Sequence, residues 1–397
     1  MTNPTEDDLT RENAGLTAPP GDIESEPGGG SLEPLEPASR RARGPVDRRI
    51  YTTGSADLDK EITDVLDRLA YYLPSVEEHL DPTDYDLIRE LMTSAVRLVS
   101  QGASRDELKM VNAALKEFAY AFRVFRPYNG QRKVSIFGSA RIEPGEESYD
   151  AARDFAKLIA DRGWMVITGA GPGIMAAGHE GAGASQSFGA NIRLPALNPA
   201  NAYIAKDGKL INFKYFFTRK VTFLKESHAF VLLPGGWGTL DECFELLTLL
   251  QTGKSDPHPV VLLDADGVDY WERWLDFVRG SVESQELIHH SDMSLLRVAH
   301  TPEEAVDEIE RFYHNYRSAR FIGNRLVLRL NRAPEAATIA RLNREFADLL
   351  TEGEFEVIDP LPAEQRDEDE LDAARLAFYP DHHYGRIREL IDVLNEL

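Results

Sequence analysis

The feature that most constrains the fold is an alternation of short apolar runs and helix-like stretches between residues 133 and 264. Apolar runs of strand length occupy residues 133–140, 164–169, 191–195, 228–234 and 259–264. Helix-like stretches separate several of these runs. This pattern predicts a parallel sheet, because parallel neighbouring strands need a long crossover connection, which is usually a helix. We therefore expect an α/β fold with a Rossmann-like, doubly wound parallel sheet.

The segments on either side of this region differ from it in composition. Residues 1–50 are acidic and rich in Pro and Gly, with too few large apolar side chains to offset the entropy of ordering, so we predict a disordered tail. Residues 51–128 form a predicted helical region, residues 129–318 the Rossmann-like domain, and residues 319–397 a small α/β appendage. The helical region is predicted from apolar residues at helical spacing, which we interpret as packing or dimerisation positions: Leu58, Ile62, Leu66 and Leu69; Leu87, Leu91, Ala95 and Leu98; Leu108, Val111, Leu115 and Phe118.

Charge and cysteine content exclude several classes of function. The net charge of −23 disfavours binding to nucleic acid, which is itself a polyanion. The single cysteine, Cys243, excludes an intramolecular disulfide and any multi-cysteine metal site. The histidine pairs His289-His290 and His382-His383 have no third metal ligand at a suitable spacing, and His179 is interpreted as structural. We predict no metal, no cofactor and no membrane contact. Without a secretory signal or a long apolar run, a cytoplasmic location is expected.

Two glycine-rich turns follow predicted strands, where an open α/β sheet binds its ligands. The first reads GAGPGIM from Gly169 to Met175. It is not a dinucleotide-binding fingerprint, because Ile174 stands where that pattern requires glycine, and it lacks the Gly-Lys-Ser/Thr of a P-loop. The second reads PGGWGTLDE from Pro234 to Glu242, where a strand ends and a helix begins. Free N–H groups at such a helix start attract phosphate.

Two pairs of polar residues have a simple structural explanation as well as a functional one. Thr239 and Glu242 have the Thr-x-x-Glu spacing of a capping box, and the spacing alone favours this structural explanation. The carboxylate of Glu242, in the first turn of the helix, would also lean towards the glycine turn. Arg219 and Lys220 would ordinarily be a solvated basic pair. The aromatic residues before them indicate instead a mostly buried segment, where an arginine needs an anion such as a substrate phosphate.

The motifs GAGPGIM, FFTRK and PGGWGTLDE, in this order, resemble those of the LONELY GUY (LOG) family, in particular its longer bacterial members. The resemblance covers roughly residues 132–318. It implies hydrolysis of the N-glycosidic bond of a nucleoside 5′-monophosphate, either AMP or a cytokinin riboside monophosphate, to free base and ribose 5-phosphate. It also implies a homodimer or larger homo-oligomer. The family's older label, lysine decarboxylase, has no support here, because no motif would place a pyridoxal phosphate lysine.

The resemblance also assigns residues to the site. Arg219 and Glu242 fall on the catalytic positions. Our hypothesis is that the glycine loops hold the 5′-phosphate, Glu242 binds ribose hydroxyls and positions water, and Arg219 stabilises the phosphate or the leaving group. Two departures from the family pattern are Ala170, which interrupts three consecutive glycines, and residues 194–201, which lack a Glu-Gln pair. The predicted substrate-binding residues are Gly138, Ser139, Gly169, Gly171, Gly173, Met175, Lys220, Gly235, Gly236, Trp237, Gly238, Thr239, Leu240 and Asp241.

Two other functions share this type of fold. One is a non-catalytic nucleotide or molybdenum-cofactor carrier, and the other is a DNA-processing protein, which the acidic composition disfavours. A passive carrier would not need Arg219 together with Glu242. The sequence therefore favours the hydrolase.

Overall fold

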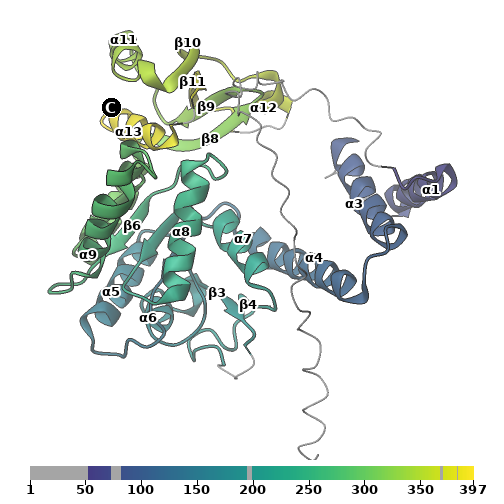
Figure 1. Ribbon diagram of the computed structural model, residues 1–397, viewed down its shortest axis with the longest axis horizontal. Coiled ribbons are helices and arrows are strands. Elements are labelled where there is room, and N and C mark those ends of the chain that lie inside the picture. The colour runs from purple at the N-terminus through teal and green to yellow at the C-terminus, as the bar shows by residue number, and fades with distance from the viewer. Residues whose placement is uncertain (1–51, 73–81, 195–198, 367–369, 382) are drawn as a thin grey trace, which may run out of the picture. The chain divides into compact units, whose positions relative to one another are not determined.

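The computed structural model describes residues 52–72, 82–194, 199–366, 370–381 and 383–397 (Figure 1). The predicted disordered tail, residues 1–50, lies outside the described residues, as does part of the departing stretch 194–201. Among the described helices, none is both long and apolar enough to cross a membrane.

A seven-stranded sheet forms the centre of the protein, and every pairing in it is parallel. Its strand order is β4-β3-β2-β1-β5-β6-β7, so the chain reverses direction across the sheet between β1 and β5. This confirms the predicted doubly wound α/β fold. The strands are β1 (Lys133–Phe137), β2 (Met165–Thr168), β3 (Ser187–Ile192), β4 (Leu210–Phe213), β5 (Ala229–Leu232), β6 (Val260–Leu263) and β7 (Leu296–Ala299).

Helices pack on both faces because alternate residues of each buried strand point to opposite sides. On β5, Val231 belongs to one apolar cluster, with α5 (Glu147–Asp161), α6 (Ile174–Ala182) and α10 (Pro302–Phe312). Its neighbours Phe230 and Leu232 belong to a second cluster, with α8 (Trp237–Gln251) and α9 (Tyr270–Phe277). A third cluster joins α4 (Arg105–Phe125) and α7 (Phe216–Glu226) to β2, β3 and β4. These layers hold the strand ends, and therefore the loops that follow them, in fixed positions.

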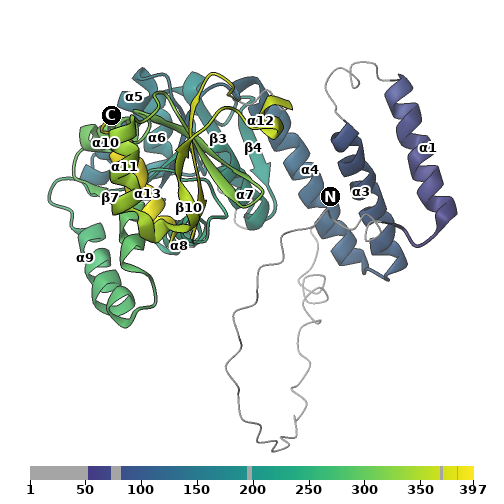
Figure 2. The same cartoon turned by 90° about the horizontal axis from the view of Figure 1, so that it is seen from above.

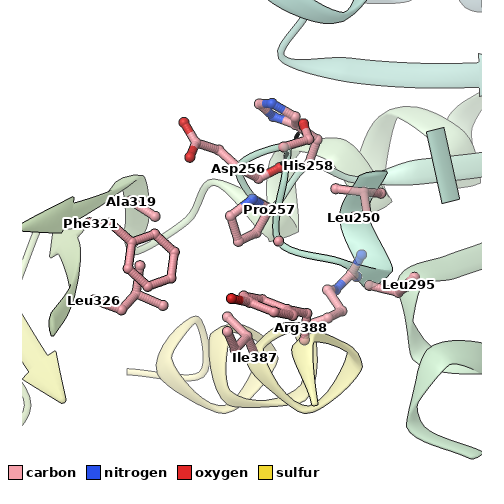
Figure 3. Close-up of a pocket in the computed structure, with 13 residues that line it drawn as sticks. Leu250, Asp256, Pro257, His258, Leu295, Ala319, Phe321, Leu326, Ile387 and Arg388 are labelled. Carbon is pink, nitrogen blue, oxygen red and sulfur yellow. Dashed lines mark hydrogen bonds between the residues drawn. The ribbon is translucent and has the colours of Figure 1, made fainter. Parts of the chain in front are cut away.

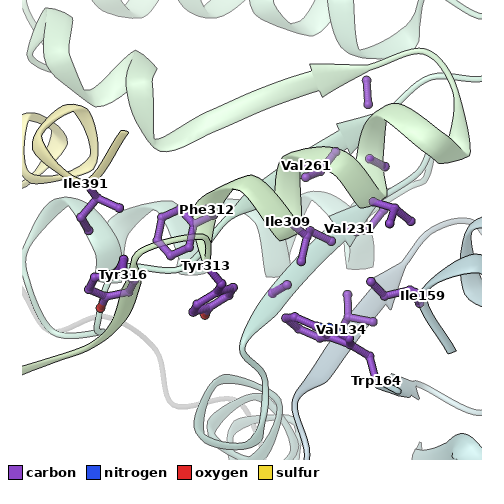
Figure 4. Close-up of a cluster of buried hydrophobic side chains, with 14 of the residues drawn as sticks. Val134, Ile159, Trp164, Val231, Val261, Ile309, Phe312, Tyr313, Tyr316 and Ile391 are labelled. Atoms are coloured by element: carbon purple, nitrogen blue, oxygen red, sulfur yellow. The ribbon is translucent and has the colours of Figure 1, made fainter. Parts of the chain in front are cut away.

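The C-terminal appendage contains a four-stranded antiparallel sheet in the order β10-β11-β9-β8. Its strands are β8 (Tyr316–Ile322), β9 (Arg325–Leu330), β10 (Leu350–Val357) and β11 (Ala374–Pro380), and its helices are α11 (Ala336–Glu345), α12 (Pro362–Arg366) and α13 (Tyr384–Leu394). The first apolar cluster runs on from Val134 and Val231 through Phe312 and Tyr316 to Ile391 of α13 (Figure 4). The two sheets therefore share one continuous hydrophobic core.

Three N-terminal helices confirm the predicted helical region: α1 (Ala56–Tyr72), α3 (Pro82–Ser100) and α4. Ser104 and Glu107 form a capping box at the start of α4. In both views α4 lies beside α7 and β4 (Figures 1 and 2), and its last turns are anchored by the fully buried Ala121 and Phe125. Several side chains predicted to pack are nevertheless exposed within the single chain, namely Leu58, Leu87, Leu91, Leu108, Val111 and Leu115. For these residues packing inside the chain is wrong, and dimerisation stays a prediction.

Candidate functional site

A cleft of about 770 Å³ opens at the carboxyl ends of β1, β2 and β5. This is the point where the strand order reverses, so the loops after β1 and β5 leave in opposite directions and a crevice remains between them. The predicted residues that line it are Gly138, Ser139, Gly169, Met175, Arg219, Gly236, Trp237, Gly238, Thr239, Leu240 and Glu242. The other predicted residues, Gly171, Gly173, Lys220, Gly235 and Asp241, do not line it. Phe137, Ala140, Arg141 and Phe223 also line it and were not predicted.

Backbone hydrogen bonds tie the glycine loops together. The N–H of Ile174 donates to the carbonyl oxygen of Ser139 at 3.0 Å, and the N–H of Ser139 donates to that of Pro234, also at 3.0 Å. Gly173 has a φ of +67°, and a Cβ there would lie 2.3 Å from the Ser139 carbonyl oxygen. Gly173 therefore packs against the loop after β1 and does not face the cleft.

The first glycine loop keeps its turn although Ala170 replaces a glycine. Ala170 takes a φ of +59°, its N–H donates to Thr168 Oγ1 at 3.0 Å, and its carbonyl oxygen accepts from the N–H of Asn201 at 2.8 Å. Asn201 Nδ2 also donates to the carbonyl oxygen of Gly171 at 3.0 Å. These bonds hold the left-handed conformation that an alanine rarely adopts. Asn201 is thus a supporting residue that the sequence analysis missed, because the contact spans thirty residues and leaves no local pattern.

His179 is structural, in agreement with the sequence interpretation. It is fully buried, burial lowers its pKa, and its ring nitrogens lie within hydrogen-bond distance of Thr168 Oγ1 (3.1 Å), the Phe188 carbonyl oxygen (3.0 Å) and Asn201. A neutral imidazole with these partners helps to hold Thr168 and Asn201, which hydrogen-bond to the first glycine loop.

The capping-box expectation for Thr239 and Glu242 is wrong. Helix α8 begins at Trp237 with Gly236 as its N-cap, and no side chain caps it. Thr239 is therefore the third residue of the helix and Glu242 the sixth, too far along to reach the N-cap. The Thr239 side chain instead packs against Gly235, where a Cβ would lie 2.1 Å from its hydroxyl oxygen. The first N–H groups of α8 consequently face the cleft without a side-chain cap, and Glu242 remains available for another role.

Arg219 and Glu242 meet inside the cleft. Arg219 Nη2 lies 3.6 Å from Glu242 Oε1, and the two side chains are only 13% and 10% exposed. Burial raises the pKa of Glu242 to about 7, although the positive charges of Arg219 and Lys220 pull it down. Burial also lowers the pKa of Arg219. Glu242 is thus a carboxylate that exchanges a proton near neutral pH, as a general base requires.

The guanidinium of Arg219 is held by aromatic rings rather than by hydrogen bonds. It lies 5.0 Å from the centre of the Phe216 ring and 5.8 Å from that of Phe223. Its Nε is buried and has no hydrogen-bond partner among the described residues. The solvated-pair explanation is therefore wrong for Arg219, whose free donor suits an incoming anion or acceptor.

Lys220 has a different environment. Its Nζ lies 2.8 Å from Asp241 Oδ2 and 2.6 Å from Glu245 Oε2. Burial lowers its pKa, but the hydrogen bonds that Lys220 donates to Asp241 and Glu245 more than compensate, so the pKa is raised overall. Lys220 therefore links α7 to α8 through ion pairs beside the cleft.

A smaller enclosed cavity of about 30 Å³ lies between the loop before β6 and the C-terminal sheet (Figure 3). Asp256, His258 and Arg388 are among its lining residues. Its volume suits about one or two water molecules rather than a metabolite, and it lies at the amino ends of the strands. It is therefore not the candidate site. The described residues also contain no group of three or more potential ligands that could hold a metal ion.

Comparisons with known proteins find a family match over a stretch that contains the second glycine turn. Residues 172–309 match the family described as "Possible lysine decarboxylase". A probable cytokinin riboside 5′-monophosphate phosphoribohydrolase from Oryza sativa subsp. japonica is 38% identical over 94 residues, which are 24% of this chain and 36% of that protein. A cytokinin riboside 5′-monophosphate phosphoribohydrolase from Arabidopsis thaliana is 28% identical over 182 residues, 46% of this chain and 83% of that protein.

The matched stretch thus spans little more than a third of the length of the rice relative. Among solved structures, the molybdenum cofactor binding protein from Rippkaea orientalis is 22% identical with a TM-score of 0.33, covering 45% of this chain and 96% of that one.

Proposed function

Residues 172–309 belong to the lysine decarboxylase-like family, also called the LOG family, and from this premise we propose that the protein hydrolyses the N-glycosidic bond of nucleoside 5′-monophosphates. The substrates are AMP or a cytokinin riboside 5′-monophosphate, and the products are the free base and ribose 5-phosphate. The observation that carries the proposal is the buried pair of Arg219 and Glu242, 3.6 Å apart, beside two glycine loops.

The phosphate is assigned to the start of α8. Gly236, Trp237 and Gly238 line the cleft there, and the first N–H groups of the helix have no side-chain cap. An uncapped helix start carries a partial positive charge and donates hydrogen bonds to phosphate oxygens. Gly169 of the first loop faces the same space without a Cβ in the way.

Glu242 is assigned to the ribose and the water. As the bond between C1′ and the base nitrogen breaks, its electron pair leaves with the base and positive charge develops on the ribose ring. An ionised carboxylate beside the ring stabilises that charge and accepts a proton from the water whose oxygen attacks C1′. Because the pKa of Glu242 is about 7, a large fraction of the enzyme carries this ionised form at neutral pH.

Arg219 is assigned to the negative charge that develops on the substrate. Its guanidinium stays charged, its side chain is mostly buried, and its Nε donor is free of partners among the described residues. It stabilises the leaving base or the phosphate, while the departing base takes a proton from solvent to become neutral and Glu242 later returns its proton to solvent.

The proposal includes a homodimer or larger assembly and a cytoplasmic location. Exposed apolar side chains gather on the two helices that carry the site, namely Phe216, Phe217 and Val221 on α7 and Trp237 and Phe244 on α8. Such clustering favours association. A free buried cysteine, Cys243, suits a reducing compartment. Light scattering after size exclusion tests the assembly, and a monomer at micromolar concentration would contradict it.

The experiment is a chromatographic assay of the purified protein with AMP, GMP, CMP and isopentenyladenosine monophosphate. We expect base release that falls by about a hundredfold or more in Glu242→Gln, the usual order of loss for a general base. Asp276→Asn, which alters an exposed carboxylate on α9, is the control and should keep full activity. Tight nucleotide binding without any base release would refute the hydrolase and favour a carrier.

A further inference from the structure

A carboxylate from α4 occupies the start of α7, the helix that carries Arg219. Glu117 Oε1 accepts the backbone N–H of Lys214 at 2.8 Å, and Glu117 Oε2 accepts the hydroxyl of Thr218 at 2.5 Å. The N-cap residue of α7 is Tyr215, whose side chain makes no capping bond. Glu117, about a hundred residues earlier in the chain, therefore ties α4 both to the residue before the N-cap and to the first turn of α7.

Two physical effects make this contact strong. Hydrogen bonds to a charged acceptor are stronger than neutral ones, and a negative charge at a helix start is stabilised by the helix dipole. The Thr218 side chain is fully buried, whereas Glu117 is half-buried, so their bond is partly shielded from competing water. The backbone carbonyl of Tyr215 lies 2.9 Å from the same hydroxyl and is its alternative acceptor.

The other end of the link is rigid as well. Ala121 and Phe125, one and two turns beyond Glu117 on α4, are fully buried in the cluster that also contains Phe223 of α7. Glu117 thus connects a fixed helix to the first turn of α7. Thr218 is the residue immediately before Arg219.

The placement of Arg219 depends on this first turn more than on its own bonds. Its distance of 3.6 Å from Glu242 is longer than a hydrogen bond, and its Nε has no partner among the described residues. Phe216 and Phe223, which stack on the guanidinium, belong to the same helix. Phe223 is fixed in the buried cluster, so a movement of the start of α7 would carry Arg219 and Phe216 away from both Glu242 and Phe223.

We propose that Glu117 is a positioning residue, which fixes the start of α7 and thereby sets the distance between Arg219 and Glu242. Glu117 lies outside the residues that match the family, so this link is a property of the N-terminal helices of this chain. The kinetic part of the inference rests on the proposed hydrolase activity, whereas the link between α4 and the Arg219–Glu242 pair does not.

The test compares Glu117→Ala, Glu117→Gln and the control Asp106→Asn, an exposed carboxylate on the same helix. For Glu117→Ala we expect kcat with AMP to fall by about tenfold or more, since a misplacement of about 1 Å can cost a hundredfold. KM should change by less than about threefold, because none of the residues that line the cleft belongs to α4. Glu117→Gln keeps an oxygen for the Lys214 N–H and should recover most of the lost kcat.

A second measurement does not require catalysis. The pKa of Glu242 is read by NMR of protein labelled with ¹³C at the glutamate carboxyl carbon, with Glu242→Gln identifying the signal. Arg219 lowers this pKa, as do the charges of Lys220, whereas Asp241 and Glu245 raise it. We therefore expect Glu117→Ala to move the Glu242 titration to higher pH, and Asp106→Asn to leave it in place.

A folded Glu117→Ala protein with unchanged kcat and an unchanged Glu242 titration would overturn the inference. Should that variant fail to fold, Thr218→Val, which removes only the buried hydroxyl, decides in the same way through the same two readouts. If the wild-type protein releases no base, the hydrolase proposal fails, but a shifted Glu242 titration in Glu117→Ala would still support the positioning role.

Discussion

Replacing Glu242 by glutamine should make the protein more stable at neutral pH while it removes the proposed activity. Burial raises the pKa of this carboxyl from its ordinary 4.5 to about 7 in the folded protein. The folded state therefore holds its proton more tightly than the unfolded state does, and ionisation costs stability. Raising the pKa over this range corresponds to about 3 kcal/mol.

The sign of the effect defines the pH window. Well below its ordinary pKa of 4.5, Glu242 is protonated in both states and the variant gains nothing. As the pH rises towards about 7, the unfolded state loses this proton first, so the wild-type protein loses stability relative to Glu242→Gln. Above that pH the difference stays constant, at up to about 3 kcal/mol.

The assay is urea unfolding followed by tryptophan fluorescence, with both proteins measured at about pH 5 and about pH 8. Only the difference between the two proteins is interpreted, because other groups titrate equally in both. Glu245→Gln is the matched control on α8. Its carboxylate pairs with Lys220 at 2.6 Å, so that variant should gain no stability at neutral pH. A Glu242→Gln protein that is no more stable than wild type at the higher pH would refute the reasoning.

Four further results are expected. The rate of base release, as kcat/KM, should fall about tenfold per pH unit below about pH 7, because protonation of Glu242 removes its charge; a rate independent of pH between about 5 and 8 would contradict this. Gly173→Ala should lower the free energy of unfolding by about 2 kcal/mol or more in urea melts, because its φ of +67° disfavours any Cβ and the Ser139 carbonyl oxygen blocks it. Trp237→Ala should leave stability within about 0.5 kcal/mol, as its side chain is 88% exposed, yet weaken purine nucleotide binding by about tenfold in calorimetry. Glu364→Gln should cost about 3 kcal/mol or more in urea melts, because its carboxylate is shared by two buried arginines of the C-terminal sheet.

The position of the candidate site could be predicted because it follows from topology. Glycine turns that follow strands lie at the carboxyl ends of a parallel sheet, and Gly169 and Gly236 follow the two strands that flank β1, so they lie close to each other. The side chain of Arg219 is largely buried, as expected, but the segment before it is not mostly buried, because Phe216 and Phe217 are exposed. These inferences need only local pattern and the rule for crossover connections.

Other features depended on contacts that the sequence does not encode locally. Strands β4 and β7 were missed because a polar residue interrupts each short apolar run, namely Asn212 in β4 and Arg297 in β7. The capping box failed because the spacing of Thr239 and Glu242 cannot say where a helix begins, and Gly236 starts it earlier. The bond from Glu117 to Thr218 spans about a hundred residues and has no sequence signature.

The strand order reverses once, between β1 and β5, and the carboxyl and amino ends of the strands then serve different functions. The loops at the carboxyl ends of the strands line the cleft, while residues 256–258, before β6, line a small cavity together with Phe321 and Ile387 of the C-terminal part. Substitutions that alter ligand choice can accumulate at the carboxyl ends of the strands without loosening the packing at the amino ends. Selection can therefore act on catalysis and on stability in the same chain through largely independent sets of residues.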